Sequence, residues 1–319
     1  MYPMKLTPAY KDYLWGGNEL SKMYNKESGL SVTAESWELC CHPDGQNKVA
    51  NGQYKGRMLA EVLKEHPDYV SSHFHTEDKF PVLIKFIDAA KALSIQVHPS
   101  DETALKEFGE EGKAEMWYIV KAKPRAFLYY GLNRRVTKEE LRAKILDGTV
   151  CDALNKVYVH EGDVFFILPG TIHAIGEGIV IAEIQQNSNS TFRVYDFKRK
   201  DANGNERELH IDRAVDVIDY KPIVPQRIED NNSMTLMHGK IEHLFESEYF
   251  KVTKIISDEE MPMFVEGDTF HSLLFIKGEG MIEYKGKRYQ FRGGDSYYIP
   301  AGINLYNIQG KFEALLTTI

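Results

Sequence analysis

"GDVFFILPGTIH" spans residues 162–173, and a similar stretch, "GDSYYIPAGINL", spans residues 294–305. Each begins with Gly-Asp, runs through an aromatic strand to an Ile, and closes a Pro-containing turn with Gly at the same offset. This repeat predicts two copies of one strand-turn-strand unit; chance recurrence of Gly-Asp turns in a β protein is the alternative. Because the copies end at His173 and Leu305, only the first ends in a side chain that can bind a metal.

Much of the remaining chain also has the pattern of short strands. Runs rich in β-branched and aromatic residues are bounded by Gly, Pro or Asp, which is typical of strands. The clearest runs are residues 80–89, 114–122, 163–169, 178–186, 250–257, 271–280 and 287–300. Their spacing predicts a mainly β protein, built as a sandwich or a barrel.

Few segments have a helical pattern. We expect helices at Leu59–Glu65, after Pro99 with Ser100 as N-cap, at Thr137–Asp147 and at Ile211–Asp219. The third is marked by a capping box of Thr137 and Glu140 and by Gly148 after its end. We expect these short helices to cover faces or ends of the sheets.

A polar segment with two prolines, KPIVPQRIEDNNSM at residues 221–234, precedes the second copy of the repeat. Such a composition is typical of a linker. The sequence therefore predicts an N-terminal metal-binding domain, residues 1–228, and a C-terminal domain without metal, residues 229–319.

Composition and charge exclude several classes of protein. With 319 residues, 43% of them apolar, the chain can bury a large core. Its formal net charge of -8 argues against binding nucleic acid or an anionic membrane surface. No apolar run approaches the roughly 20 residues of a membrane span, and the first residues lack a signal-peptide core, so we expect a cytoplasmic protein. The three cysteines form neither a disulfide framework nor a CxxC metal knuckle.

The segment LSIQVH, residues 93–98, alternates apolar and polar side chains as a half-buried strand does. Ser94, Gln96 and His98 must therefore share one face. Three polar side chains lined up in this way predict a polar site on the inside of the sheet.

Two further segments can supply ligands to the same site. Glu115 lies on a later strand, two residues after Lys113, and His173 follows a Gly turn near a strand start. Together with Gln96 and His98 they form a mixed nitrogen and oxygen donor set that suits zinc and leaves room for water or substrate. An open set of this kind indicates a catalytic metal.

Each of these residues also has a purely structural interpretation. His98 could cap the turn that follows it, Gln96 could be a hydrogen-bonded core amide, and Glu115 could pair with Lys113 at the surface. For an isolated His the structural interpretation is the more common one, so the case for a metal depends on the four residues meeting.

Several separated motifs together resemble the type I phosphomannose isomerases, the zinc-dependent mannose-6-phosphate isomerases of the cupin superfamily, in their short bacterial form. They are WGG at 15–17, QVHP at 96–99, KAE at 113–115, LPGTIHAI at 168–175 and EIQQNSNSTFRVYDF at 183–197. The resemblance covers essentially the whole chain. It implies two cupin barrels, also called double-stranded β-helices or jelly rolls, with the metal in the first barrel and none in the second.

Residue by residue, the resemblance implies that one zinc ion per chain is held by Gln96, His98, Glu115 and His173. It further implies that the essential arginine is Arg193, and that the other pocket residues are Lys85, Lys113, Ser94 and Glu183. The chain departs from the family pattern in KAE, where many members have KPE, and in Asn189 and Phe192, where many have Asp and Tyr. These differences affect the fine positioning of the pocket residues and remove no ligand.

The implied reaction interconverts mannose 6-phosphate and fructose 6-phosphate through a cis-enediolate. Zinc would offset the negative charge that develops on oxygen, and Arg193 would add a fixed positive group; its alternative is a salt bridge to Asp196 or Glu183. Lys85 and Lys113 would hold the phosphate or polarise hydroxyls, or else be solvated charges at a strand edge. Glu183, a neutral Lys113 and a metal-bound hydroxide are all able to move the proton, and Glu183 could instead orient Arg193.

Two other classes of function remain open at this level. One is a regulatory cupin that binds a sugar phosphate without turnover, and the other is a metal-dependent oxygenase. The chain has Gln96 where the usual HxH pair has its first His, and this replacement favours Lewis-acid catalysis over redox chemistry. His210, His243 and His271 have no partner ligand nearby in the sequence, so we expect them to be dispensable for metal binding.

Overall fold

The strands lie in three sheets, and two of these enclose the first barrel. The computed structural model describes residues 1–201, 203–225, 227 and 233–319. A six-stranded sheet has the order β10 (Val164–Ile167), β7 (Glu115–Ala122), β12 (Ile179–Gln186), β5 (Val82–Ala89), β3 (Glu35–Leu39), β2 (Ala9–Lys11). A five-stranded sheet has the order β13 (Phe192–Tyr195), β6 (Ile95–Val97), β11 (His173–Ile175), β8 (Phe127–Leu132), β9 (Leu154–Tyr158).

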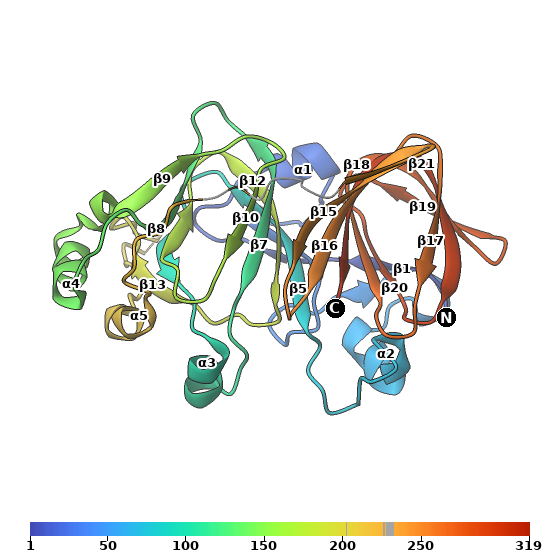
Figure 1. Cartoon of the computed structure of the whole chain (residues 1–319), viewed down its shortest axis with the longest axis horizontal. Coiled ribbons are helices and arrows are strands. Elements are labelled where there is room, and N and C mark those ends of the chain that lie inside the picture. Colours follow the sequence, from blue (N-terminus) through green and yellow to red (C-terminus); the bar gives the residue numbers. More distant parts are fainter. Residues whose placement is uncertain (202, 226, 228–232) are drawn as a thin grey trace.

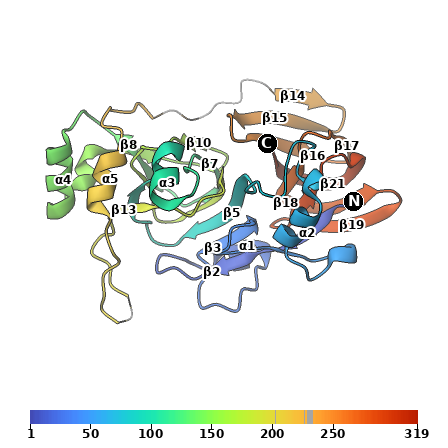
Figure 2. The ribbon, with the colours of Figure 1, turned by 90° about the horizontal axis from the view of Figure 1, so that it is seen from below.

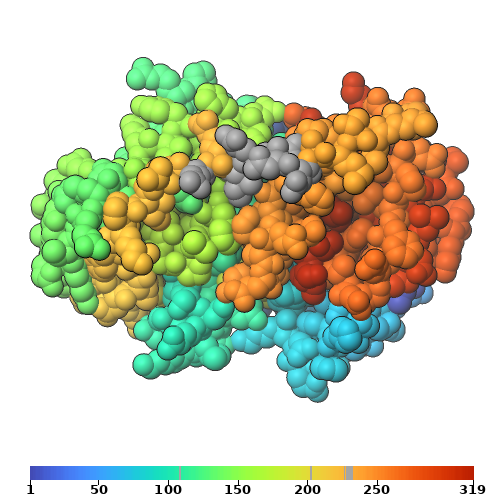
Figure 3. Space-filling model, viewed as in Figure 1, coloured from blue at the N-terminus to red at the C-terminus, as the bar shows by residue number. Residues whose placement is uncertain are grey.

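The third sheet is built mainly from the C-terminal part of the chain. Its ten described strands are β14 (Ser233–Leu236), β15 (Gly239–Glu246), β16 (Lys251–Ser257), β21 (Asn304–Thr318), β18 (His271–Tyr284), β20 (Ser296–Ile299), β1 (Met4–Thr7) and β4 (Lys48–Val49), with β17 (Glu260–Val265) on β21 and β19 (Lys287–Arg292) on β18. Two lobes result, which lie side by side in Figure 1 and meet along the middle of the molecule in Figure 3. The prediction of a mainly β protein is confirmed.

The helices are short and lie at the edges of the sheets. They are α1 (Glu19–Tyr24), α2 (Leu59–Glu65), α3 (Asp101–Phe108), α4 (Lys138–Asp147) and α5 (Ile211–Val217). Three one-turn 3₁₀ segments lie at Gly52–Tyr54, Pro67–Tyr69 and Val150–Ala153. Among the described residues, no helix is long and apolar enough to cross a membrane.

The four predicted helices are present, and the sequence analysis missed α1. Thr137 accepts a hydrogen bond from the Glu140 amide at the start of α4, and Gly148 ends it in the left-handed conformation, with φ of 84°. The predicted α5 ends two residues early, at Val217, where the chain turns to an extended conformation. In Figures 1 and 2, α4 and α5 cover the outer end of the first lobe.

The repeat that opened the sequence analysis is present in three dimensions. Gly162 and Gly294 adopt nearly the same left-handed conformation, with φ of 90° and 89°. Asp163 accepts a backbone hydrogen bond from Ile119, and Asp295 accepts one from Phe275 in the same way. The prediction of two copies of one unit is therefore confirmed.

The first strand of the chain joins the sheet of the second lobe. Met4 and Lys5 of β1 pair with Tyr298 and Tyr297 of β20. The predicted boundary between residues 228 and 229 lies outside the described residues, so the two-domain division stays a proposal.

The six-stranded sheet is buried on both faces, and this arrangement shields the site. On its outer face Ile84, Phe86 and Ile184 join an apolar core that continues into the second lobe through Phe250 and Leu274. Its inner face carries polar side chains toward the interior of the first barrel. Because water is excluded from the outer face, every residue of β5 and β12 is buried.

Candidate metal centre and active site

The strands around the first barrel bring the predicted polar residues to one interior space. In the five-stranded sheet His173 of β11 pairs with Gln96 of β6, and Gln96 pairs on its other side with Arg193 of β13. In the six-stranded sheet Glu183 of β12 lies between Lys85 of β5 and Trp117 of β7. Since alternate residues of a strand share a face, these side chains point between the two sheets.

A polar cavity of about 250 Å³ fills this space. Its walls include all of the predicted site residues except His98 and His173, which lie behind Glu115. The lining residues are Tyr13, Trp15, Glu35, Lys85, Ile87, Leu93, Ser94, Gln96, Lys113, Glu115, Ile175, Glu183, Asn189, Thr191, Arg193 and Arg207. The volume is suited to a small polar molecule.

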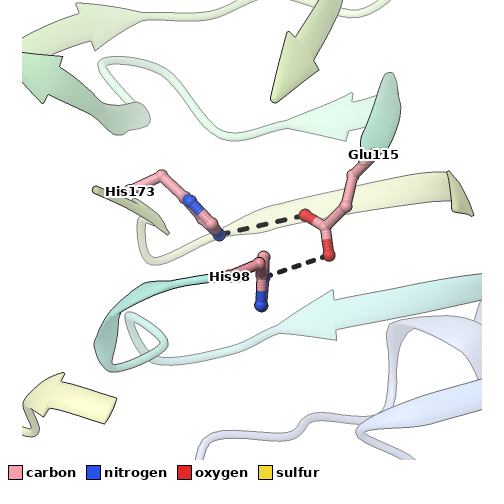
Figure 4. Close-up of side chains that lie close together, drawn as sticks. All are labelled: His98, Glu115 and His173. Carbon is pink, nitrogen blue, oxygen red and sulfur yellow. Dashed lines mark ion pairs between the residues drawn. The ribbon is translucent and has the colours of Figure 1, made fainter. Parts of the chain in front are cut away.

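Two imidazoles converge on the Glu115 carboxylate, which lies at the floor of the cavity, and the two rings lie just outside the cavity (Figure 4). His98 Nε2 lies 3.2 Å from Glu115 Oε1, and His173 Nε2 lies 3.8 Å from Glu115 Oε2. One potential ligand atom from each of the three residues lies within 4.8 Å of the others. All three side chains are buried, so this is an interior cluster rather than a surface group of charges.

Hydrogen bonds turn both imidazoles toward the same point. His98 Nδ1 donates to the Ser190 carbonyl at 3.0 Å, and His173 Nδ1 donates to the Thr171 carbonyl at 2.8 Å. With the proton fixed on Nδ1, each ring offers the lone pair of Nε2, as a metal-binding His does. Neither His98 Nε2 nor Glu115 Oε1 makes a hydrogen bond to a described residue, and both are buried. These facing acceptor atoms fit a divalent cation between them.

Gln96 completes the set of predicted ligands. Its amide Nε2 lies 3.4 Å from His173 Nε2. To bind a cation the amide must turn over and present its oxygen, a rotation within the same space.

Burial keeps both imidazoles neutral, which ligand binding requires. Burial and the nearby Lys113 ammonium lower the pKa of His98 to about 3, and burial also lowers the pKa of His173. Burial alone would raise the pKa of Glu115, but His98 and Lys113 outweigh it and hold that pKa well below its usual range. At neutral pH the cluster therefore presents two neutral nitrogens and one carboxylate.

Glu183 is held in a second buried network next to the cluster. Its Oε1 lies 2.9 Å from Lys85 Nζ, which is also 3.7 Å from Glu35 Oε1, and its Oε2 accepts a 2.8 Å hydrogen bond from Trp117 Nε1. Burial and the nearby Glu115 carboxylate raise the pKa of Glu183 to about 7, even though Lys85 opposes this. A carboxyl group with that pKa can both release and accept a proton near neutral pH.

The cavity wall formed by β13 and the segment after it is basic. Arg193 Nε is buried without a hydrogen bond to any described residue, and its Nη1 donates to the Glu208 carbonyl at 2.8 Å. Arg207 Nε and Nη2 bind the Asp196 carboxylate at 2.7 and 2.6 Å, and Arg199 also binds Asp196. Two guanidinium groups share the Asp196 carboxylate and Arg193 adds a third positive charge, which leaves this wall with an excess of positive charge.

The structure distinguishes several alternatives that the sequence left open. Arg193 forms no ion pair with Asp196 or Glu183 among the described residues, because Arg199, Arg207 and Lys85 occupy those carboxylates. Lys113 Nζ lies 3.3 Å from Glu115 Oε1, but this pair is buried rather than at the surface.

Some cavity residues were not identified from the sequence. Glu35, Trp117 and Arg207 each contact a predicted site residue or line the cavity. Trp117 could have been found, since it alternates with Glu115 on the same strand. Glu35 and Arg207 come from segments without a polar repeat, so nothing in their local pattern marks them.

The three histidines that were expected to be dispensable lie outside the three-residue cluster. His210 Nδ1 accepts a hydrogen bond from the Arg193 amide at 3.1 Å, and His271 Nδ1 lies 3.0 Å from the Tyr306 hydroxyl in the second lobe. His243 Nδ1 lies 3.4 Å from the Thr253 hydroxyl. Their dispensability for metal binding stays a prediction.

Comparison with known proteins gives a consistent result. Residues 4–124 match the catalytic domain of type I phosphomannose isomerase, and residues 240–319 match the cupin domain of mannose-6-phosphate isomerase. A mannose-6-phosphate isomerase of Bacillus subtilis is 37% identical over 99% of this chain and 98% of its own. The chain belongs to the type I phosphomannose isomerases.

Two further relatives agree with this family assignment. A mannose-6-phosphate isomerase of Streptococcus mutans is 35% identical over 98% of this chain and 97% of its own. The crystal structure of the mannose 6-phosphate isomerase from Bacillus subtilis superimposes with a TM-score of 0.93 at 33% identity and covers all of both chains. The predicted family and the two-barrel cupin fold are confirmed. A zinc-bound mannose 6-phosphate isomerase, 15% identical with a TM-score of 0.78, has the same fold.

Proposed function

We propose that the protein interconverts mannose 6-phosphate and fructose 6-phosphate with the help of one zinc ion per chain. The observation that carries the proposal is the buried cluster of His98, Glu115 and His173 at the floor of a polar cavity, in a chain of this family. Two neutral nitrogens, a carboxylate oxygen and the Gln96 amide oxygen form a mixed donor set with room for substrate, as in catalytic zinc sites. Bound there, zinc would act as a Lewis acid that polarises the oxygens at C1 and C2 of the sugar.

The reaction moves the carbon-bound proton between C2 and C1, and a hydroxyl proton between O2 and O1, through a cis-enediolate. As the proton leaves C2, negative charge develops on the substrate oxygens, and a fixed positive group nearby lowers the barrier. We assign this role to Arg193, whose buried Nε has no acceptor among the described residues and is therefore available to a ligand. Burial and the neighbouring Arg207 lower the pKa of Arg193, yet an arginine stays charged near neutral pH.

We assign the proton transfer to Glu183. Its pKa of about 7 is close to neutral pH, so at neutral pH this group accepts and returns a proton with equal ease. Trp117 and Lys85 fix its two oxygens, so the carboxyl group is oriented before the substrate arrives. Lys113, next to Glu115, would donate a hydrogen bond to a substrate oxygen.

The distribution of charge suggests how the sugar phosphate is oriented. At the floor, Lys85 is already paired with Glu183 and Glu35, so it suits a hydrogen bond to a sugar hydroxyl, together with Ser94. Arg199 and Arg207 outnumber the one carboxylate that they bind, so the end of the wall at Arg207 has the excess positive charge that a phosphate dianion requires. We therefore place the phosphate toward Arg207, and C1 and C2 toward the metal and Arg193.

The wider setting of the enzyme is also a proposal. Three free cysteines fit the reducing cytoplasm, where sugar phosphates are made and used. The net charge of -8 fits a protein that binds a small anion in a local basic pocket rather than nucleic acid. We retain the division into a metal-binding domain, 1–228, and a metal-free domain, 229–319.

A coupled assay tests this function. Purified protein is stripped with a chelator, given mannose 6-phosphate, and assayed for fructose 6-phosphate before and after zinc is added. We expect no turnover without metal and restored turnover with zinc. Binding of the sugar phosphate without turnover at any metal loading would instead identify a regulatory protein and refute the proposal.

A further inference from the structure

The orientation of His98 depends on a loop that lies outside the metal cluster. Residues 187–191 link β12 to β13, and the Ser190 carbonyl in this loop receives the hydrogen bond from His98 Nδ1 at 3.0 Å. If this carbonyl moves, the ring loses the partner that keeps its proton on Nδ1 and its Nε2 directed at the cluster. The orientation of His98 therefore depends on the contacts that hold Ser190 in place.

The Glu110 carboxylate fixes this loop by accepting hydrogen bonds from the hydroxyl groups of two serines in the loop. Glu110 Oε2 accepts hydrogen bonds from Ser190 Oγ at 2.7 Å and from Ser188 Oγ at 3.3 Å. The Ser190 amide in turn donates to Ser188 Oγ at 3.3 Å. Both serines are thus tied to the same oxygen, and a hydrogen bond to a charged group is stronger than one between neutral groups.

Glu110 comes from the segment that delivers another proposed ligand. It lies between α3 and β7, and β7 begins at Glu115. The carboxylate therefore joins the segment that carries Glu115 to the loop that orients His98. Its other oxygen, Oε1, lies 3.8 Å from His42 Nε2. About a third of the Glu110 side chain is exposed, so replacing it opens no cavity in the core.

Other contacts hold the neighbouring residues Ser188 and Asn189 but do not involve Ser190. Gln185 Nε2 donates to the Ser188 carbonyl at 2.6 Å, and Asn189 Nδ2 donates to Asp44 at 2.8 Å. The Ser190 side chain itself is bound by Glu110. Removing this carboxylate should loosen Ser190 while the neighbouring anchors remain.

We propose that Glu110 is a positioning residue of the metal centre, acting on His98 through Ser190. The proposal rests on the proposed role of His98 as a zinc ligand. Residues that orient a metal ligand typically contribute about 10- to 100-fold to metal affinity. Because Glu110 acts one step further away, we expect an effect at the lower end of that range, about tenfold.

Competition with a chromogenic chelator, on the full-length protein, measures the zinc affinity directly and needs no turnover. Glu110→Ala should bind zinc about tenfold more weakly than the wild type. Glu110→Gln keeps an oxygen that can accept from the serines, so it should recover most of the affinity. Glu107→Ala, an exposed carboxylate on α3, is the matched control and should bind zinc as the wild type does.

A double-mutant cycle tests the route through the loop. If Glu110 acts through the Ser190 hydroxyl, Glu110→Ala and Ser190→Ala together should weaken zinc binding by less than the product of the two single effects. Multiplicative effects, a Glu110→Ala affinity within twofold of wild type, or a Glu110→Gln variant as weak as Glu110→Ala would each overturn the proposal. Thermal unfolding of the metal-free variants should match that of the metal-free wild type.

The same titration separates this inference from the proposed function. If His98→Ala binds zinc as tightly as the wild type, then His98 is no ligand and the proposed metal site fails. If the wild type binds tightly, His98→Ala does not, and Glu110→Ala is unchanged, only the role of Glu110 fails.

Discussion

The two barrels share one strand-turn-strand unit but carry different residues at matching positions. In the first barrel Ile167 pairs with Glu115; in the second, Ile299 pairs with His271. Across the neighbouring strands, His173 pairs with Gln96, whereas Leu305 pairs with Phe264. A donor set in one copy is thus replaced by two apolar residues and a single imidazole in the other.

The environment of these positions differs as much as their chemistry. His173 is fully buried, but Leu305 and Phe264 are 58% and 60% exposed. The interior of the second barrel holds stacked rings, with Phe275 and Phe291 centred 3.7 Å apart. The same backbone unit supports a polar cavity in one lobe and a packed apolar core in the other.

The second barrel covers the outer face of the six-stranded sheet of the first barrel. Its residues Phe250 and Leu274 share a core with Phe86 and Ile184 on the outer face of the six-stranded sheet. With that face dry and packed, Lys85 and Glu183 on the inner face are fixed by strands that cannot bend toward solvent. The proposed metal site is therefore supported by packing from both lobes, although its proposed ligands come from one.

Removing a ligand should produce the largest difference between the lobes. We expect His98→Ala and His173→Ala to lose zinc and to lower turnover on the order of 10³-fold, the equivalent of several kcal/mol of Lewis-acid stabilisation. His271→Ala, at the position of the second barrel that matches Glu115, should keep both. Metal analysis and the coupled assay measure these outcomes. Full zinc retention in His98→Ala or His173→Ala, or loss of zinc in His271→Ala, would break the comparison.

Arg193 should affect the reaction without affecting the metal. For Arg193→Ala we expect wild-type zinc content and a kcat lower by about 10²- to 10³-fold, the usual cost of losing one group that stabilises the transition state. The Michaelis constant should change much less. A variant altered only in KM would show that Arg193 binds the ground state.

The duplicated glycines allow a matched test of stability. Gly162→Ala should cost about 1 to 2 kcal/mol, because it forces a left-handed conformation on Ala while its Cβ has open space. Gly294→Ala should cost about 1 to 3 kcal/mol more, since its Cβ would lie 2.5 Å from Cβ of Tyr24. Free energies of unfolding from urea titration measure both. Equal costs would mean that the contact with Tyr24 relaxes freely.

His271 should make the stability of the folded protein depend on pH. Burial lowers the pKa of His271 to about 4 in the folded protein, against about 6.5 in the unfolded chain. Between these values the unfolded chain binds a proton that the folded chain does not, so stability falls as the pH drops from about 6.5 to 4. The slope approaches about 1.4 kcal/mol per pH unit.

The corresponding measurement compares the metal-free wild type with His271→Gln, which cannot titrate. We expect the difference in free energy of unfolding between the two proteins to change between pH 7 and pH 5. If the free energies of unfolding of the two proteins changed with pH in parallel, the His271 imidazole would be accessible to solvent in the folded protein.

Alternation in single strands was enough to predict which faces carry the site. Ser94 and Gln96 line the cavity, and Ile95 and Val97 lie in a core on the other side of the same strand. Strong local signals also worked for α4, where Thr137 caps the first turn. In both cases the deciding interactions lie within a few residues of each other.

Features set by distant contacts could not be predicted. The pairing of β1 with β20 joins residues nearly 300 positions apart, for which no local pattern exists. The α1 helix was missed because it has six residues and its N-cap, Asn18, makes no side-chain hydrogen bond. Arg207 lines the cavity with its guanidinium group bound to Asp196, on another segment, a contact that no local pattern marks.

The most direct test of the account is the position of the metal. Crystals of zinc-loaded protein, measured at the zinc absorption edge, should give one anomalous peak per chain, bounded by His98, Glu115, His173 and the Gln96 oxygen. A peak beside His271, or none between the three-residue cluster and Gln96, would contradict it.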